Sequence, residues 1–128
     1  MRIFKNAWFE RFAKKQRITD KALLEAIERA ENGQIDADLG GGVLKQRVAR
    51  EGQGKSGGFR TIILYRRAGR AVFVYGFAKS DRDNIEDSEE SQFKKLAMSV
   101  LNLSDKQLDE LVNRKQFFEV QDGKKIQE

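Results

Sequence analysis

Three short apolar runs between residues 44 and 79 constrain the fold of this chain more than any other feature. They cover residues 44–49, 59–65 and 71–78, are together rich in β-branched and aromatic residues, and are bounded by glycine or charge. Such runs are typical of β-strands. Residues 67–70 form a tight turn between the second and third runs, and a longer loop, 50–58, joins the first two. We therefore expect a three-stranded antiparallel meander.

Positive charge is concentrated in this meander. Residues 43–82 contain ten lysines and arginines against two acids, which gives +8, whereas the whole chain carries only +5. The remainder of the chain therefore sums to −3. A sheet that carries more than all of the net charge indicates a polyanionic partner, with nucleic acid first.

Composition limits the chemistry that is available. The chain has 128 residues, which suits one domain with a single core. It has no cysteine and no histidine, so disulfides, thiolate metal sites, imidazole ligands and a histidine base are excluded. No apolar run reaches the length of a membrane span, and no apolar leader segment stands at the N-terminus. We expect a cytoplasmic protein that uses no metal, no cofactor and no membrane.

The rest of the chain is mostly helical. Residues 2–5 are a candidate opening strand, residues 7–17 and 19–32 show helical spacing of apolar residues, and so do residues 93–101 and 105–112. The acidic stretch 83–92 is interpreted as a solvated connection. The order β-α-α-β-β-β-α-α predicts an α+β fold, with an N-terminal helical hairpin packed on a small, mostly antiparallel twisted sheet and helices at the C-terminus. We expect one domain over 1–128, with a core of about 1–102, a helical extension at about 104–120 and a frayed tail at 121–128.

The loop between the first two strands imitates two nucleotide-binding motifs. Residues 52–57 match G-x-G-x-x-G, and residues 54–56 resemble the end of a Walker A motif. Both motifs require a helix immediately after the loop, because the helix N-terminus binds the phosphates. A strand is predicted to follow here, so we interpret the segment as a flexible basic loop.

Four cations of the meander are candidates for chemistry on RNA. Lys45 and Arg47 are two residues apart on one strand and therefore share a face, Arg60 begins the next strand, and Lys79 follows the third. Cleavage of an RNA phosphodiester needs a base for the 2′-OH, neutralisation of the phosphorane and an acid for the 5′ oxygen. The planar fork of arginine suits the second task. Lysines held near other cations lose a proton more readily, so they can serve the first and third. A basic surface that only binds RNA remains the alternative.

These segments resemble the RelE/ParE superfamily of type II toxins, in its RelE-like and HigB-like branch, over residues 1–102. The matching segments are Leu44-Lys45-x-Arg47-Val48, Gly58-Phe59-Arg60-x-Ile62-x-x-Tyr65, Ala78-Lys79 and the sequel Ser80-Asp81-Arg82-Asp83-Asn84-Ile85. The resemblance implies that Lys45 and Arg47 are basic residues of the active sheet. It also implies that Arg60 stabilises the phosphate and that Lys79 supplies a cation at the end of the last strand.

The chain departs from the family where many members carry a further arginine and a tyrosine or histidine. Ser80 and Glu86 stand at those positions. The base is therefore open between Lys45, Lys79 and Tyr75, and the acid between Lys79 and Lys55. Further cations are expected to grip the RNA backbone: Arg50, Lys55, Arg66, Arg67 and Arg82.

The resemblance implies the toxin of a type II toxin–antitoxin system that cleaves mRNA on the ribosome, an mRNA interferase that inhibits translation. Its partners would be a cognate antitoxin, the ribosome and mRNA. Two alternatives remain. One is an inhibitor of DNA gyrase, like the ParE relatives that share the fold without the ribonuclease residues. The other is an RNA-binding protein without catalysis.

Overall fold

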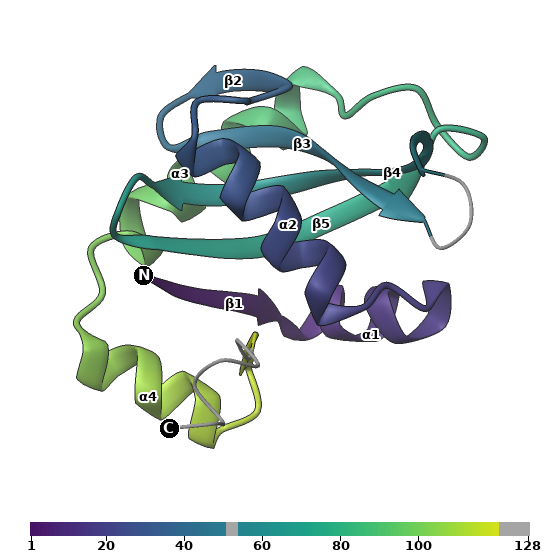
Figure 1. Cartoon of the computed structure of the whole chain (residues 1–128). Coiled ribbons are helices and arrows are strands. Elements are labelled where there is room, and N and C mark those ends of the chain that lie inside the picture. The colour runs from purple at the N-terminus through teal and green to yellow at the C-terminus, as the bar shows by residue number, and fades with distance from the viewer. Residues whose placement is uncertain (51–53, 121–128) are drawn as a thin grey trace.

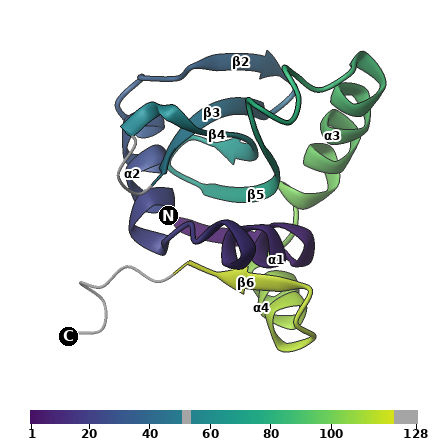
Figure 2. The same ribbon diagram turned by 90° about the vertical axis from the view of Figure 1, so that its right-hand side faces the viewer.

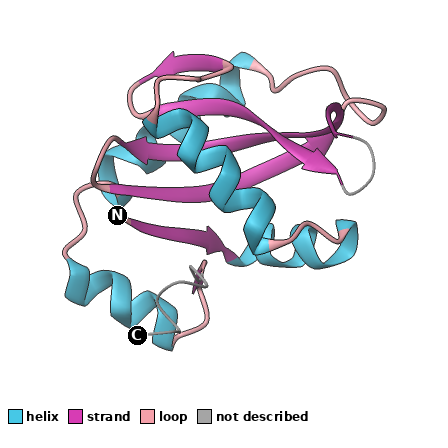
Figure 3. Cartoon of the chain, in the orientation of Figure 1, coloured by secondary structure: helices cyan, strands magenta, loops and turns pink. Residues whose placement is uncertain are grey.

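The fold is α+β, as expected. The computed structural model describes residues 1–50 and 54–120, the side chains of residues 54–56 excepted. The strands are β1 (Arg2–Asn6), β2 (Ala37–Gly40), β3 (Val43–Arg50), β4 (Gly54–Arg66), β5 (Arg70–Ala78) and β6 (Phe117–Glu119). The helices are α1 (Ala7–Gln16), α2 (Asp20–Glu31), α3 (Asp87–Val100) and α4 (Asp105–Asn113). Figure 3 shows one sheet with helices on both sides.

The strands form a single six-stranded sheet in the order β2-β3-β4-β5-β1-β6. The predicted meander is confirmed as β3, β4 and β5, paired antiparallel. The only parallel pair within the described residues joins β1 to β5. Two strands were not predicted: β2 lies in the segment expected to be a loop, and β6 lies in the expected helical extension.

The expected N-terminal helical hairpin is not confirmed. The chain opens with the strand β1, and the two helices follow it. They also do not form a unit of their own, because α1 packs on β1 and β5 whereas α2 packs on β3. β1 takes the first place because it pairs with β5 and extends the sheet beyond the meander.

Each face of the sheet has its own apolar core. Helices α1 and α2 cover one face, with Phe9, Leu23 and Phe73 among the buried residues. Helix α3 covers the other face over β3 and β4, where Ile62 and Val100 are buried. Figures 1 and 2 show α2 and α3 on opposite sides of the meander. The side of the sheet on which α3 lies is called the α3 face below.

Helix α1 closes the edge of β5 beyond the end of β1. The Asn6 side chain accepts a hydrogen bond from Phe9 N at 2.8 Å and donates one to the Val74 carbonyl at 3.2 Å. It thus caps the helix and ties its start to β5. A Cβ at Gly76 would lie 2.7 Å from the Phe12 ring. Only glycine therefore permits this approach of helix and strand.

The C-terminal part of the described chain joins the sheet. β6 pairs antiparallel with β1, and Leu108 of α4 and Phe117 of β6 are buried. The expected frayed tail, residues 121–128, lies outside the described residues. Within residues 1–50 and 54–120, none of the helices is both long enough and apolar enough to cross a membrane.

Candidate active site

A pocket of about 190 Å³ on the α3 face brings three predicted catalytic cations together. It is lined by Asp36, Lys45, Arg47 and Arg60, and we call it the cation pocket. Arg47 and Arg60 are register partners on β3 and β4, so their side chains share a face. Lys45 lies two residues earlier on β3 and shares that face too. The expected juxtaposition of these three residues is therefore present.

Asp36, just before β2, anchors Arg47. Its carboxylate accepts hydrogen bonds from Arg47 N at 2.6 Å, Nη2 at 3.0 Å and Nε at 3.2 Å. Arg29 of α2 approaches the same carboxylate at 3.8 Å. Partial burial opposes ionisation of Asp36, but the hydrogen bonds from Arg47 and the charges of both arginines prevail and lower the pKa of Asp36. Asp36 is therefore a fixed anion that orients Arg47.

A buried network supports Asp36 and Arg47 from the opposite face. Gln46, between the two pocket cations of β3, is fully buried and accepts a hydrogen bond from Asp36 N at 2.9 Å. Its amide donates to the carbonyls of Ala26 and Gln34, both at 3.0 Å. Arg29 Nη2 donates to the Arg47 carbonyl. Helix α2 thereby fixes the backbone that presents the pocket.

Arg60 carries an unused donor. Its Nη1 atom is buried and has no hydrogen-bond partner within the described part of the chain. A buried guanidinium N–H without an acceptor is costly, and such groups nearly always find a partner. The pocket beside it holds two further cations, so the acceptor that fits is an anion such as a phosphate oxygen.

The other candidate bases and acids lie outside the cation pocket. Lys79 is exposed in the turn after β5 and is not among the pocket residues. Tyr75 does share the face, since it pairs with Ile62, the register partner of Lys45. However, Arg82 Nη1 donates a hydrogen bond to the Tyr75 hydroxyl at 3.0 Å. Lys45, whose Nζ donates to Asn84 at 3.2 Å, is therefore the candidate base that lines the pocket.

The family model described as "RelE toxin of RelE / RelB toxin-antitoxin system" matches residues 1–120. The chain belongs to the RelE toxin family. It is thus a toxin of a toxin–antitoxin system, and family membership implies a cognate antitoxin as partner. No curated protein matches the sequence.

The cations expected to grip RNA in this RelE-family toxin do not form one surface. Arg66 and Arg67 lie at the β4–β5 turn, six residues or about 20 Å along β4 from Arg60. Arg50 lies at the other end of the meander, with its guanidinium 5.4 Å from the Phe59 ring centre. The Lys55 side chain falls outside the described residues.

Two of the meander's cations have structural partners. Arg82 forms an ion pair with Glu89 of α3 at 2.6 Å, and hydrogen bonds from Glu89 and Tyr75 raise the pKa of Arg82. Arg70 is buried and donates to the carbonyls of Val100 at 3.1 Å and Leu103 at 2.5 Å, where burial lowers the pKa of its guanidinium. Much of the charge counted in the meander therefore attaches α3 to the sheet.

The sequence did not reveal the partners of the pocket cations. Asp36 precedes an unpredicted strand, and Asn84 lies in a connection with no strand or helix signal. The alternation of β3 predicts that Gln46 faces away from Lys45 and Arg47, but not what it bonds. Within residues 1–50 and 54–120, no group of three or more acidic side chains is placed to hold a metal ion.

Proposed function

We propose that this toxin is a ribosome-dependent mRNA endoribonuclease that acts in the cytoplasm and inhibits translation. The observation that carries the proposal is the cation pocket, where the buried, unpartnered Nη1 of Arg60 lies among Lys45, Arg47 and Asp36. RelE-family membership supplies the toxin role. The pocket supplies a place for a scissile phosphate.

The proposed reaction is attack of a ribose 2′-OH on its own 3′ phosphate. A base removes the 2′ proton, and the 2′ oxygen forms a bond to phosphorus. The bond from phosphorus to the 5′ oxygen then breaks, and that oxygen receives a proton. The products are a 2′,3′-cyclic phosphate and a free 5′-OH. The step consumes no water and no external oxidant or reductant.

Arg60 and Arg47 are assigned to the phosphate. Arg60 Nη1 donates to a non-bridging oxygen as charge develops on the phosphorane, which for such preorganised donors is worth about 3 kcal/mol. Asp36 occupies Nε and Nη2 of Arg47, so Nη1 is the Arg47 donor left for a second oxygen. Asp36 thus sets the direction from which Arg47 meets the phosphate.

Lys45 is assigned as the base because it lines the pocket beside both arginines. The hydrogen bond from Lys45 Nζ to Asn84 Oδ1 orients the amine. The acid stays open between Lys79, at the end of β5, and Lys55. The ribosome would bring the message to this site and hold the 2′-OH in line, which is why free RNA is expected to be a poor substrate.

The test is induced expression of the wild type and Arg60→Ala, with growth followed and the ends of translated messages mapped. Arg67→Ala is the matched control, because Arg67 is an exposed arginine at the far end of the sheet. Cuts within codons that persist in Arg67→Ala and disappear in Arg60→Ala are expected. Growth arrest with intact messages in all three proteins would contradict the proposal and indicate a protein target, such as gyrase.

A further inference from the structure

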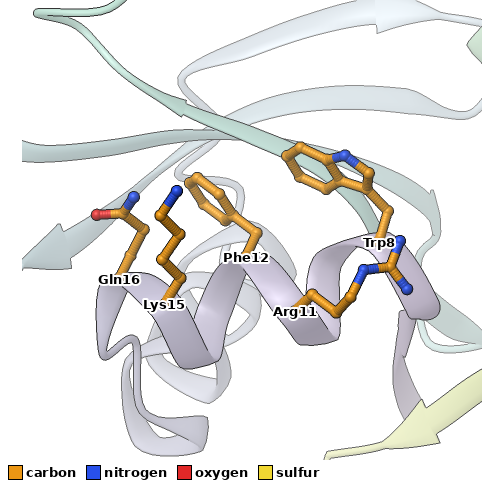
Figure 4. Close-up of a pocket in the computed structure, with 5 residues that line it drawn as sticks. All are labelled: Trp8, Arg11, Phe12, Lys15 and Gln16. Atoms are coloured by element: carbon orange, nitrogen blue, oxygen red, sulfur yellow. The ribbon is translucent and has the colours of Figure 1, made fainter.

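A second surface of the chain combines aromatic rings with unpaired cations. It is a groove of about 370 Å³ along α1, within the size range of small-ligand sites. Its lining residues recur at helical spacing: Trp8, Arg11, Phe12, Lys15 and Gln16. We call it the α1 groove. Figure 4 shows the rings of Trp8 and Phe12 next to each other on one side of the helix, with Lys15 rising beside Phe12.

The rings of the α1 groove are accessible to a ligand. Trp8 is 37% exposed, although a large apolar side chain at this position gains nothing from contact with water. It stacks on Phe12 with ring centres 5.1 Å apart and an interplanar angle of 17°. Phe12 is in turn held edge-on against Phe59 at 5.6 Å. The pair is a rigid aromatic platform of the kind on which nucleic-acid bases stack.

The charge of α1 suits a polyanion. The helix has a single acid, Glu10, which pairs with Lys5 at 2.9 Å. Arg11 and Lys15, both exposed, form no ion pair with any side chain in residues 1–50 and 54–120. Two free cations beside two stacked rings match a phosphate and a base of one nucleotide.

A row of aromatic side chains connects this groove to the cation pocket. The Tyr75 ring centre lies 4.6 Å from that of Trp8 and 6.1 Å from that of Phe77. Phe77 is the register partner of Arg60. The Arg82 guanidinium lies 5.8 Å and 5.7 Å from the ring centres of Tyr75 and Phe77. Strands β3 and β5 are two strand spacings apart, about 10 Å, so one extended strand of RNA can reach both sites.

We propose that the α1 groove is a nucleotide-binding subsite for the RNA strand whose phosphodiester lies in the cation pocket. An unstacked base lies against Trp8 and Phe12, and Arg11 and Lys15 bind the flanking phosphates. The identity of the strand rests on the ribonuclease function proposed above, but the binding itself does not. Because the groove reads stacking and charge, it takes single-stranded RNA with little preference for sequence.

The test uses the intrinsic fluorescence of the protein, because Trp8 is its only tryptophan. The probe is a short single-stranded RNA in which every 2′-OH is methylated, so that binding is measured without cleavage. We expect saturable quenching of Trp8 fluorescence by this probe and none by the same RNA annealed to its complement. RNA binding seen by anisotropy without any change in Trp8 fluorescence would overturn the proposal.

A matched pair of variants separates the groove from general charge. In the double variant Arg11→Gln/Lys15→Gln we expect about ten-fold weaker binding, and a log K against log salt slope that is smaller by about 1.4, or about 0.7 for each phosphate contact. The control Lys14→Gln/Lys21→Gln removes the same charge from exposed positions outside the groove and should change affinity less than two-fold. Equal weakening of both variants would refute a defined subsite.

Cleavage of ribosome-bound mRNA by the same proteins distinguishes the two proposals. A wild type that cleaves but shows no Trp8 quenching overturns the groove alone. A protein that is quenched normally but does not cleave overturns the ribonuclease function and leaves the groove standing.

Discussion

Replacing Asp36 by asparagine tests how the cation pocket is held. The change keeps the shape of the side chain but removes the charge that faces Arg47 and Arg29. Asparagine can still accept the bond from Arg47 N, now 2.6 Å long, through its amide oxygen. Its NH₂ group, however, would face the donors of the Arg47 guanidinium, which now lie 3.0 and 3.2 Å from one carboxylate oxygen. One favourable charged contact becomes a donor facing a donor.

The size of the effect follows from the exposure of the pair. Charge-assisted hydrogen bonds contribute about 1.5–3 kcal/mol when shielded, whereas exposed ion pairs contribute about 0–1 kcal/mol. The side chain of Asp36 is 23% exposed and that of Arg47 is 42% exposed, so water screens the pair in part. We expect Asp36→Asn to lower the free energy of unfolding by about 1–2 kcal/mol at pH 7.

The pH dependence gives this prediction its sign. The folded-state pKa of Asp36 is lowered, so its contribution is complete above the unfolded-state value of about 3.9 and is lost as the pH falls through the folded value. The difference in stability between the wild type and Asp36→Asn should therefore be constant near neutral pH and shrink below about pH 4.

Urea unfolding of both proteins at pH 7 and pH 3 measures this difference. Asp38→Asn is the control, since Asp38 forms no ion pair with any described side chain and bonds only the nearby Gly40 N, at 2.9 Å. In cleavage assays, Asp36→Asn should bind RNA slightly more tightly, because an anion has left the pocket, yet cleave about ten-fold more slowly, because Arg47 loses its orientation. A stability difference of the same size at pH 7 and pH 3 would refute the role given to the ionised carboxylate.

The remaining predictions concern the support of the two sites and the far end of the sheet. Gln46→Ala should lower the free energy of unfolding by about 2–4 kcal/mol, because it leaves buried polar groups without partners, whereas the exposed Gln92→Ala should change it by less than about 0.5 kcal/mol; thermal melts compare the two. Gly76→Ala should cost about 1–3 kcal/mol, because its Cβ would meet the Phe12 ring at 2.7 Å, and it should alter Trp8 fluorescence as α1 shifts. Arg67→Ala should leave cleavage of ribosome-bound mRNA within two-fold of the wild type, because Arg67 lies at the far end of β4; a larger loss would extend the active surface to that end.

The meander was predictable because its signal is local. Runs 44–49, 59–65 and 71–78 became β3, β4 and β5, and the alternation of β3 placed Lys45 and Arg47 on one face. β2 escaped prediction because its four residues show no strand composition and its pairing depends on the turn at Gly41 and Gly42, both with positive φ. β6 has only three residues and forms because β1 offers a free edge.

The acidic stretch 83–92 was misinterpreted as a solvated connection. Half of it is the start of α3, where Glu86 and Glu89 form a capping box and Glu89 also binds Arg82. Acids at this position are stabilised by the helix N-terminus. The mistake followed from reading charge without its partner, which lies seven residues away at the end of the meander.

The site was predictable only in part, for a similar reason. Strand pairing follows from the hairpin order, so Lys45, Arg47 and Arg60 could be brought together from the sequence. The burial of Arg70 depends on where α3 docks, which no local pattern encodes. Asp36 approaches β3 only because the unpredicted β2 forms beside it.

The most direct test of the account is the rate at which purified toxin cleaves mRNA bound to ribosomes, compared between the wild type and Arg60→Lys. Lysine keeps the positive charge but cannot present the second N–H of a planar fork to the phosphate. We predict 2′,3′-cyclic phosphate ends from the wild type and cleavage about 100-fold slower in Arg60→Lys. A rate for Arg60→Lys within two-fold of the wild type would contradict the assignment of Arg60, and with it the cation pocket as the active site.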